Sequence, residues 1–280
     1  MPESKSPTTG QVAAVIYADL FNFPLTPEEL YFWEIKTDKG KNYRGRSGIR
    51  FQEGFWYVLG REKIVRRRKK MAGYSRRCLE RIRTIPAHLS RIPTVEGIFL
   101  TGSLAIENGG KNADADLMII TKPGTMWLTR LLVVTWLKIS GNYRTVQNQV
   151  GTICPNIFLD TDHLKITEQN LFTAHEVLQA RCLYDRRGVE QRWLAENKWT
   201  KNYLPNAYKL RIGNWKLIGN WQLEIGNFWL IPFETIAFWL QYFYMKPKMT
   251  NEKVGWGAAF FHPQNLSREV MEQFHKRLAV

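Results

Sequence analysis

The segment from residue 95 to residue 121 limits the fold of this chain more than any other. It reads as a strand, a Gly-Ser turn that opens a helix, a polar glycine-rich loop, and a second strand that begins with two carboxylates. Residues 98–100 are an apolar run of β-forming residues, which is typical of a strand buried on both faces. Residues 117–120 continue the second strand into the core. The segment therefore predicts two buried strands with a polar site between them.

Gly102 and Ser103 form the predicted turn between the first strand and the helix. Glycine lets the backbone turn sharply and lets a ligand approach it closely. Ser103 can cap a helix over residues 104–107, and the free N–H groups at that helix start favour an anion such as a triphosphate. We therefore predict that Gly102 and Ser103 bind an anion.

Asp114 and Asp116 are two residues apart, so on a strand they point to the same face. Two adjacent carboxylates repel each other unless a cation lies between them. Mg²⁺ suits such a pair, because it takes oxygen ligands and keeps positions open for phosphate oxygens. The alternative is that Ser103 is only a helix cap and that both aspartates are solvated at a strand edge.

Gly102-Ser103, ten further residues, Asp114-Ala115-Asp116 and an apolar strand together resemble the signature of the DNA polymerase beta-like nucleotidyltransferase superfamily. The resemblance implies that Gly102 and Ser103 hold a nucleoside triphosphate such as ATP. It implies that Asp114 and Asp116 ligate catalytic Mg²⁺ (or Mn²⁺). The implied activity is a magnesium-dependent nucleotidyltransferase, which moves a nucleoside monophosphate to an acceptor hydroxyl and releases pyrophosphate.

Members of this superfamily usually carry a third acid on a later strand, and here the next strand candidate is Ile153–Asp160. Its even-numbered residues are expected to share a face. Asn156 lies mid-strand, where the resemblance leads one to expect an acid, and an amide cannot take a proton. Asp160 at the strand end is the candidate third catalytic residue. Alternatively, it forms a turn pair with Asp162.

Because of Asn156, a second function stays open: a catalytically inactive nucleotidyltransferase-fold protein that acts as a nucleic-acid-binding regulator. The two hypotheses differ in which side chain reaches Asp114 and Asp116. A third carboxylate beside the pair favours the enzyme, and Asn156 alone favours the regulator. His175 and Glu176 are adjacent on a predicted helix and face different ways, so a structural role is expected for both.

The N-terminal part predicts a winged-helix-like module over residues 11–91, after a disordered tail over residues 1–10. Helices are expected over 11–21 and 28–35, the second with Thr26 as N-cap and Pro27 in its first turn. Residues 55–59 and Ile64-Val65 are expected to pair as a two-stranded wing.

A dense basic run lies within residues 61–83, predicted as part of a helix over residues 64–90. The chain carries a formal net charge of +15, so a polyanionic partner is expected. The run is either a clamp for a nucleic-acid backbone or a solvated helix between two domains.

The sequence as a whole predicts an α+β fold: a small mixed-sheet nucleotidyltransferase core over residues 92–185 and a helical C-terminal region over residues 186–280. A Trp-rich repeat occupies residues 212–230 of that region. The expected core elements are strands over 95–100, 117–121 and 153–159 and helices over 125–140 and 169–182.

Three widely spaced cysteines and a polar start predict a cytoplasmic location. No integral membrane segment is expected. The apolar stretch over residues 228–245 carries Pro232, Glu234 and Gln241, so it is expected to be a core helix. The alternative is an interfacial helix of a membrane-surface protein that uses the excess positive charge. The oligomeric state is left open.

Overall fold

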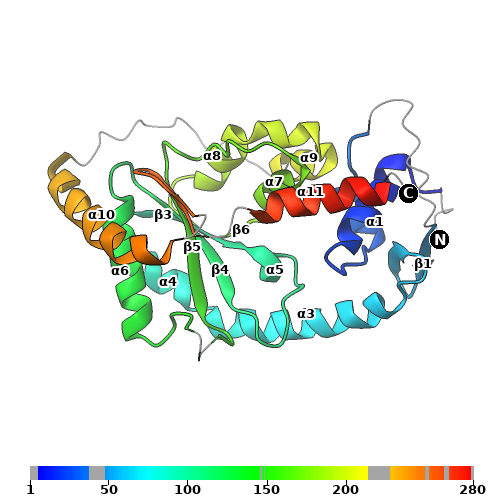
Figure 1. The fold of residues 1–280 in the computed structure, drawn as a ribbon, viewed down its shortest axis with the longest axis horizontal. Helices are drawn as coiled ribbons and strands as arrows, with labels where there is room; N and C mark the ends of the chain where they lie inside the picture. Colours follow the sequence, from blue (N-terminus) through cyan, green and yellow to red (C-terminus); the bar gives the residue numbers. More distant parts are fainter. Residues whose placement is uncertain are drawn as a thin grey trace.

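The computed structural model describes residues 6–37, 48–145, 147, 149–213, 228–249, 252–261 and 265–278. Within these residues a six-stranded mixed sheet forms the centre of the molecule, in the order β6-β3-β4-β5-β8-β7 (Figure 1). Its strands are β3 (Val95–Thr101), β4 (Ala115–Thr121), β5 (Ile153–Asp160), β6 (Arg181–Asp185), β7 (Lys253–Val254) and β8 (Ala258–Phe260). β4 and β5 are parallel, and the other neighbours are antiparallel. The predicted α+β class is confirmed.

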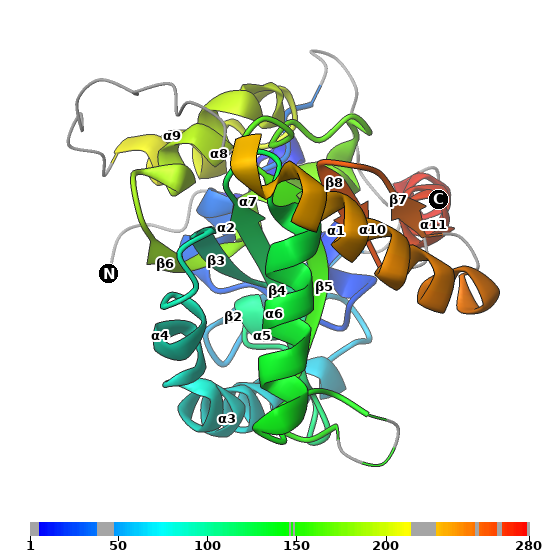
Figure 2. The ribbon, with the colours of Figure 1, turned by 90° about the vertical axis from the view of Figure 1, so that its left-hand side faces the viewer.

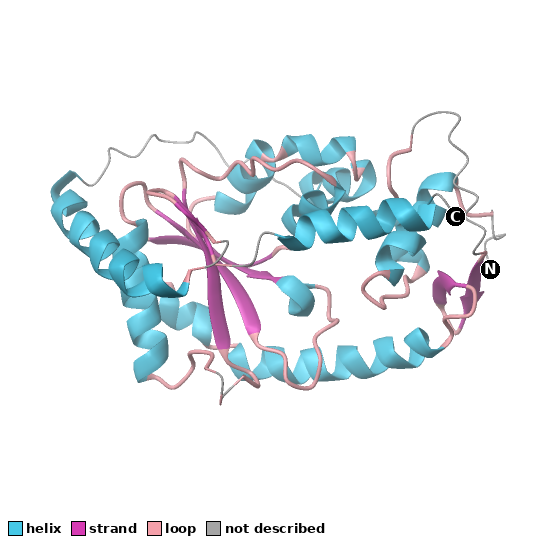
Figure 3. Ribbon diagram, in the orientation of Figure 1, coloured by secondary structure: helices cyan, strands magenta, loops and turns pink. Residues whose placement is uncertain are grey.

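Helices cover both faces of this sheet (Figures 2 and 3). Alternate strand residues point to opposite faces, so Ile98 and Leu100 join one apolar cluster while Phe99 joins the other. The first cluster includes residues of α4 (Ile85–Leu89), α6 (Met126–Ile139) and α10 (Ile231–Met245). The second includes residues of α7 (Leu171–Gln179), α8 (Val189–Glu196), α9 (Pro205–Gly213) and α11 (Asn265–Leu278). Short 3₁₀ turns cover Lys198–Asn202, Phe228–Leu230 and Lys246–Lys248. No described helix has both the length and the apolar character needed to cross a bilayer.

The N-terminal region packs into the second of these clusters. It contains α1 (Thr9–Asp19), α2 (Pro27–Phe32) and a hairpin of β1 (Ile49–Gln52) with β2 (Phe55–Val58). Apolar residues of α1 belong to the same cluster as Phe99 of the central sheet. The two parts of the chain therefore share one core.

Three N-terminal expectations need correction. Thr8 caps α1 with a capping box, so the described part of the expected tail already starts a helix, and residues 1–5 lie outside the described residues. The wing partner of β2 is β1, because Glu53 and Gly54 both adopt positive φ in a two-residue turn. Ile64-Val65 instead begins α3 (Lys63–Ile82). Thr26 caps α2 as expected. The winged-helix assignment stays a prediction.

The core also differs from the expected one at its edges. The helix expected over residues 169–182 ends at Gln179, and Arg181–Asp185 forms the edge strand β6 beside β3. The C-terminal region, expected to be helical, supplies β8, which pairs with β5. The expected boundary after residue 185 therefore cuts across the sheet. Residues 214–227 of the Trp-rich repeat lie outside the described residues.

Candidate functional site

The turn after β3 brings the backbone against the start of β4. Thr101 is opposite Asp116 in the register, and Gly102 follows with φ +64°. A side chain at Gly102 would overlap the Asp116 carboxyl group. The position therefore requires glycine for its backbone angle and for the close approach.

Ser103 lies in the first turn of the short helix α5 (Gly102–Ala105) and is exposed. The expected capping role of Ser103 is wrong, because Thr101 is the N-cap residue and makes no side-chain capping hydrogen bond. Ser103 is at the surface and follows Gly102, which lies against the Asp116 carboxyl group.

The glycine-rich loop between α5 and β4 is held by the basic helix α3. Arg67 donates to Asn108 Oδ1 at 2.9 Å, and Arg68 donates to the carbonyl of Ile106 at 2.9 Å. The Ser75 hydroxyl accepts from the Gly109 N–H at 3.0 Å. Part of the basic run thus fixes the loop that leads into Asp114.

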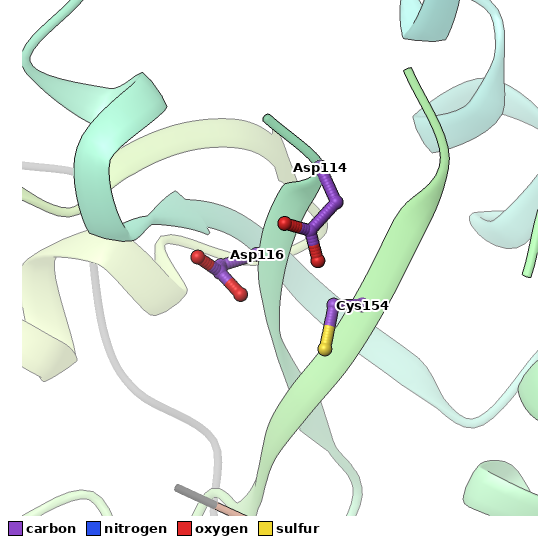
Figure 4. A group of neighbouring side chains, drawn as sticks. All are labelled: Asp114, Asp116 and Cys154. Atoms are coloured by element: carbon purple, nitrogen blue, oxygen red, sulfur yellow. The ribbon is translucent and has the colours of Figure 1, made fainter. Parts of the chain in front are cut away.

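Asp114 and Asp116 lie side by side at the start of β4, beside Cys154 at the start of β5 (Figure 4). One ligand atom from each of these three residues lies within 4.8 Å of the other two. Burial and the neighbouring charge of Asp114 raise the pKa of Asp116 from 3.8 to about 7. The electrostatics of this pair favour a cation.

Arg144 is a basic side chain that contacts this pair. Its Nε lies 3.1 Å from Asp114 Oδ2, and Asp114 raises the pKa of Arg144. Among the described residues, Asp114 Oδ2 is buried and accepts no well-aligned hydrogen bond. Arg144 is 44% exposed, so it can move aside for a metal or contact a phosphate.

The donor set fits Mg²⁺ at the two carboxylates and does not fit a thiolate metal. Burial, followed by the charges of Asp116 and Asp114, raises the pKa of Cys154 to about 11, so its thiol is protonated at neutral pH. A neutral thiol is a poor ligand for a hard cation. Asp114 and Asp116 are the residues that would hold the metal.

Asn156 reaches the pair from β5. Its Nδ2 donates to Asp116 Oδ1 at 2.7 Å, and this contact lowers the pKa of Asp116 against the effect of burial. The strand pairing shifts register here: Leu117 pairs with Pro155, and Met118 pairs with Ile157. Asn156 is the extra residue of a β-bulge, so the expected alternation of faces along β5 fails.

The structure does not bring Asp160 to the pair. Asp160 is opposite Thr121 in the register, while Asp116 is opposite Cys154, so five strand positions along β4 separate them, or about 17 Å. Asp160 Oδ1 accepts from the Asp162 N–H at 3.0 Å and lies 2.6 Å from His163 Nδ1. Asp160 closes a turn after the strand and is not placed as a third ligand.

Glu176 on α7 is a carboxylate that the sequence reasoning set aside. Burial, followed by the charge of Asp116, raises the pKa of Glu176 to about 7. Gln179 donates to its Oε1. The adjacent His175 has the expected structural role, because its ring stacks on Tyr17 and Trp33. The helical spacing alone gave no sign that Glu176 and Asp116 interact.

Comparisons with known proteins do not show a family for this chain. No family model matches the chain, and none of the curated proteins matches it. One solved structure, described as "Crystal structure of the toxin-antitoxin with AMP-PNP", is similar over 48% of this chain and 95% of its own, at 14% identity and a TM-score of 0.28. A similarity at this TM-score carries no argument about fold or activity.

Proposed function

We propose that this protein is a magnesium-dependent nucleotidyltransferase that moves a nucleoside monophosphate from a triphosphate to an acceptor hydroxyl. The observation that carries the proposal is the Asp114–Asp116 pair at the Gly102 turn. Its buried member has a pKa raised to about 7 in the absence of a cation. Carboxylates held in this way stabilise a bound cation and recover part of their own electrostatic cost when it binds.

Each residue of the site has a role in this proposal. Gly102 lets the triphosphate approach the backbone, and the Ser103 hydroxyl and the first N–H groups of α5 donate to its terminal phosphates. Arg144 leaves its ion pair with Asp114 and contacts a phosphate oxygen of the triphosphate instead. Bound Mg²⁺ would neutralise the charge that develops on the phosphoryl oxygens and on the leaving pyrophosphate.

Glu176 is our candidate for the group that takes the proton of the acceptor hydroxyl. Burial and the charge of Asp116 raise the pKa of Glu176 to about 7, which brings it into the range that suits a general base. It takes the place of Asp160, which lies at the far end of β5. Asn156 holds Asp116 in position but cannot accept the proton.

The acceptor class that the charges favour is a nucleic acid. Arg67 and Arg68 form hydrogen bonds within the fold. The other basic residues of α3 are exposed: Lys63, Arg66, Lys69, Lys70, Arg76, Arg77 and Arg81. The Cys78 Sγ on the same helix lies 3.6 Å from the carbonyl oxygen of Ala113, next to Asp114. A phosphate backbone bound along this helix would therefore run towards the carboxylate pair.

A second candidate function is a nucleic-acid-binding regulator with an inactive core. The contact between Asn156 and Asp116 favours it, because this contact occupies the place where a third carboxylate was expected. In that case the same carboxylates bind a metal–nucleotide complex as a regulatory ligand, and the basic face of α3 carries the function.

Label transfer separates the two functions. Purified protein is incubated with each α-labelled nucleoside triphosphate, Mg²⁺ or Mn²⁺, and cellular RNA, protein or metabolite fractions, beside an Asp114→Asn/Asp116→Asn double variant. The proposal expects label on one acceptor fraction and none with the variant. No transfer with any nucleotide, together with salt-sensitive binding of nucleic acid, would establish the regulator instead.

A further inference from the structure

The helix α10 turns its polar residues inward and its apolar residues outward. The buried positions of Ile231–Met245 include Glu234 and Gln241. The exposed positions of α10 and of the turn before it carry large apolar side chains: Trp229, Ile231, Phe233, Ile236, Trp239, Leu240, Phe243 and Tyr244. These side chains, which we call the α10 apolar face, are between 44% and 72% exposed. A helix on a water-exposed surface has the opposite pattern.

Hydrogen bonds to α6 fix this orientation. Glu234 accepts from the backbone N–H groups of Trp127 at 2.7 Å and Leu128 at 2.8 Å, in the first turn of α6. Gln241 donates to the Trp127 carbonyl at 2.8 Å and accepts from Arg130 at 2.5 Å. Rolling α10 to bury its aromatic rings would leave these buried polar groups without partners, which is costly. The apolar face therefore stays outward.

The exposed apolar surface extends beyond α10 itself. Leu132 and Ile139 of α6 and Trp256 before β8 are also exposed, and Trp256 contacts Phe238 of α10 with ring centroids 5.3 Å apart. In Figure 1, α10 and α6 lie at the end of the molecule opposite the β1–β2 hairpin. Large apolar side chains gathered on one exposed helix face mark a surface that a partner protein or a membrane covers.

The charges around the α10 apolar face indicate that it contacts a membrane surface and not a second copy of this chain. Lys138 and Lys246 are exposed at its border, where Lys138 lies over the Tyr244 ring and Lys246 lies over the Tyr242 ring. The acid of α10, Glu234, is buried. Tryptophan, tyrosine and lysine together are typical of segments that lie in the headgroup region of a bilayer. A second copy of this chain would bring two lysine borders together in a protein of net charge +15, which opposes self-association.

We propose that the α10 apolar face inserts into the surface of an anionic membrane, with the bordering lysines on the lipid headgroups. The helix lies in the plane of the interface and does not span it. This docking does not rest on the proposed function, because no residue of the α10 apolar face belongs to the carboxylate pair or to α3.

Vesicle flotation tests this proposal. The full-length protein is mixed with vesicles of phosphatidylglycerol and phosphatidylcholine, or of phosphatidylcholine alone, at 0.15 M and at 0.5 M salt. We expect binding to the anionic vesicles, with a fraction that persists at high salt because the apolar contact is not screened. Trp239→Ser/Phe243→Ser is expected to weaken binding at least tenfold. Ile236→Ser/Leu240→Ser tests the same face if the first variant gives too little folded protein.

The matched control is Phe51→Ser/Leu59→Ser, which removes two exposed apolar side chains at the opposite end of the molecule. It is expected to bind vesicles like the wild type. Equal binding by the α10 variants, or an equal loss in the control, would overturn the proposal. So would a wild-type dimer that the α10 variants abolish, seen by light scattering in a protein that does not float with vesicles.

Discussion

At the scale of residues, the site depends on two adjacent carboxylates and on the glycine that lies against one of them. Gly102 has a positive φ, and a methyl group there would meet the Asp116 carboxyl group. Gly110, in the same loop region, has nothing within 4 Å of the place where its Cβ would be. The two glycines form a matched pair for mutation.

We predict that Gly102→Ala lowers label transfer at least tenfold and that Gly110→Ala leaves it within about twofold. Backbone strain and displacement of Asp116 are the physical reasons for the first effect. Transfer rates and melting temperatures of both variants are the measurement. Equal effects of the two substitutions would show that the close approach at Gly102 has no part in activity.

The raised pKa of Asp116 predicts a dependence of stability on pH. The folded-state value of about 7 lies above the ordinary 3.8, so between these values the folded state binds more protons than the unfolded state. Stability contributed by this group is therefore present at low pH and lost as the pH rises towards and through 7. We predict that Asp116→Asn, measured without Mg²⁺ at pH 8, raises the melting temperature by at least about 2 °C.

The same comparison at pH 4 should show a much smaller difference, because wild-type Asp116 is then largely protonated. Thermal unfolding at the two pH values checks this. A variant that is less stable than the wild type at pH 8 would mean that Asp116 is not a strained carboxylate.

At the scale of elements, α3 divides its basic residues between two tasks. Arg67 and Arg68 hold the loop before Asp114, and Arg68 also pairs with Glu29 at 2.7 Å. Arg76 and Arg77 face solvent. The sequence alone did not distinguish these two groups of arginines, because it does not show which face of the helix packs against the rest of the protein.

We predict that Arg76→Gln/Arg77→Gln weakens nucleic-acid binding and reduces the slope of log affinity against log salt by up to about 2, without lowering the melting temperature. Arg268→Gln/Lys276→Gln on the surface of α11 removes the same charge elsewhere and should leave that slope nearly unchanged. Salt titrations of binding by fluorescence anisotropy measure both. A similar loss of nucleic-acid affinity in the two variants would show that α3 contributes only through the net charge of the protein and is not a specific binding surface.

The elements that the sequence predicted best are those whose pattern is local. β3, β4 and α6 were expected almost within their observed bounds, because their apolar runs are long and their turn residues are strong. β6 and β8 were missed, because five-residue and three-residue strands are defined by their distant partners β3 and β5. The position of Asp160 was misread because the bulge at Asn156 reverses the faces of β5.

At the scale of the whole molecule, the N-terminal region and the sheet share a core. Tyr17 of α1 stacks on His175 of α7 and contacts Phe274 of α11 edge-on. Asp19 pairs with both Arg61 and Arg277, which joins the start of the chain to its last helix. This arrangement was not visible in the sequence, which suggested separate modules.

We predict that Tyr17→Ala destabilises the N-terminal region and the sheet together. The loss of a large buried ring costs about 3–5 kcal/mol, so the single unfolding transition should move to lower temperature as a whole. Calorimetry and circular dichroism should give the same midpoint. Two separate transitions, with only one of them shifted, would show that the N-terminal region folds independently.

We propose that Gly102, Asp114 and Asp116 together bind a triphosphate through a divalent cation. The most direct measurement is isothermal titration of a non-hydrolysable nucleoside triphosphate, with Mg²⁺ and with the chelator EDTA, into the wild type and Asp114→Asn/Asp116→Asn. We expect binding to the wild type only with Mg²⁺ and at least tenfold weaker binding to the variant. Equal binding with and without Mg²⁺, or unchanged binding by the variant, would contradict it.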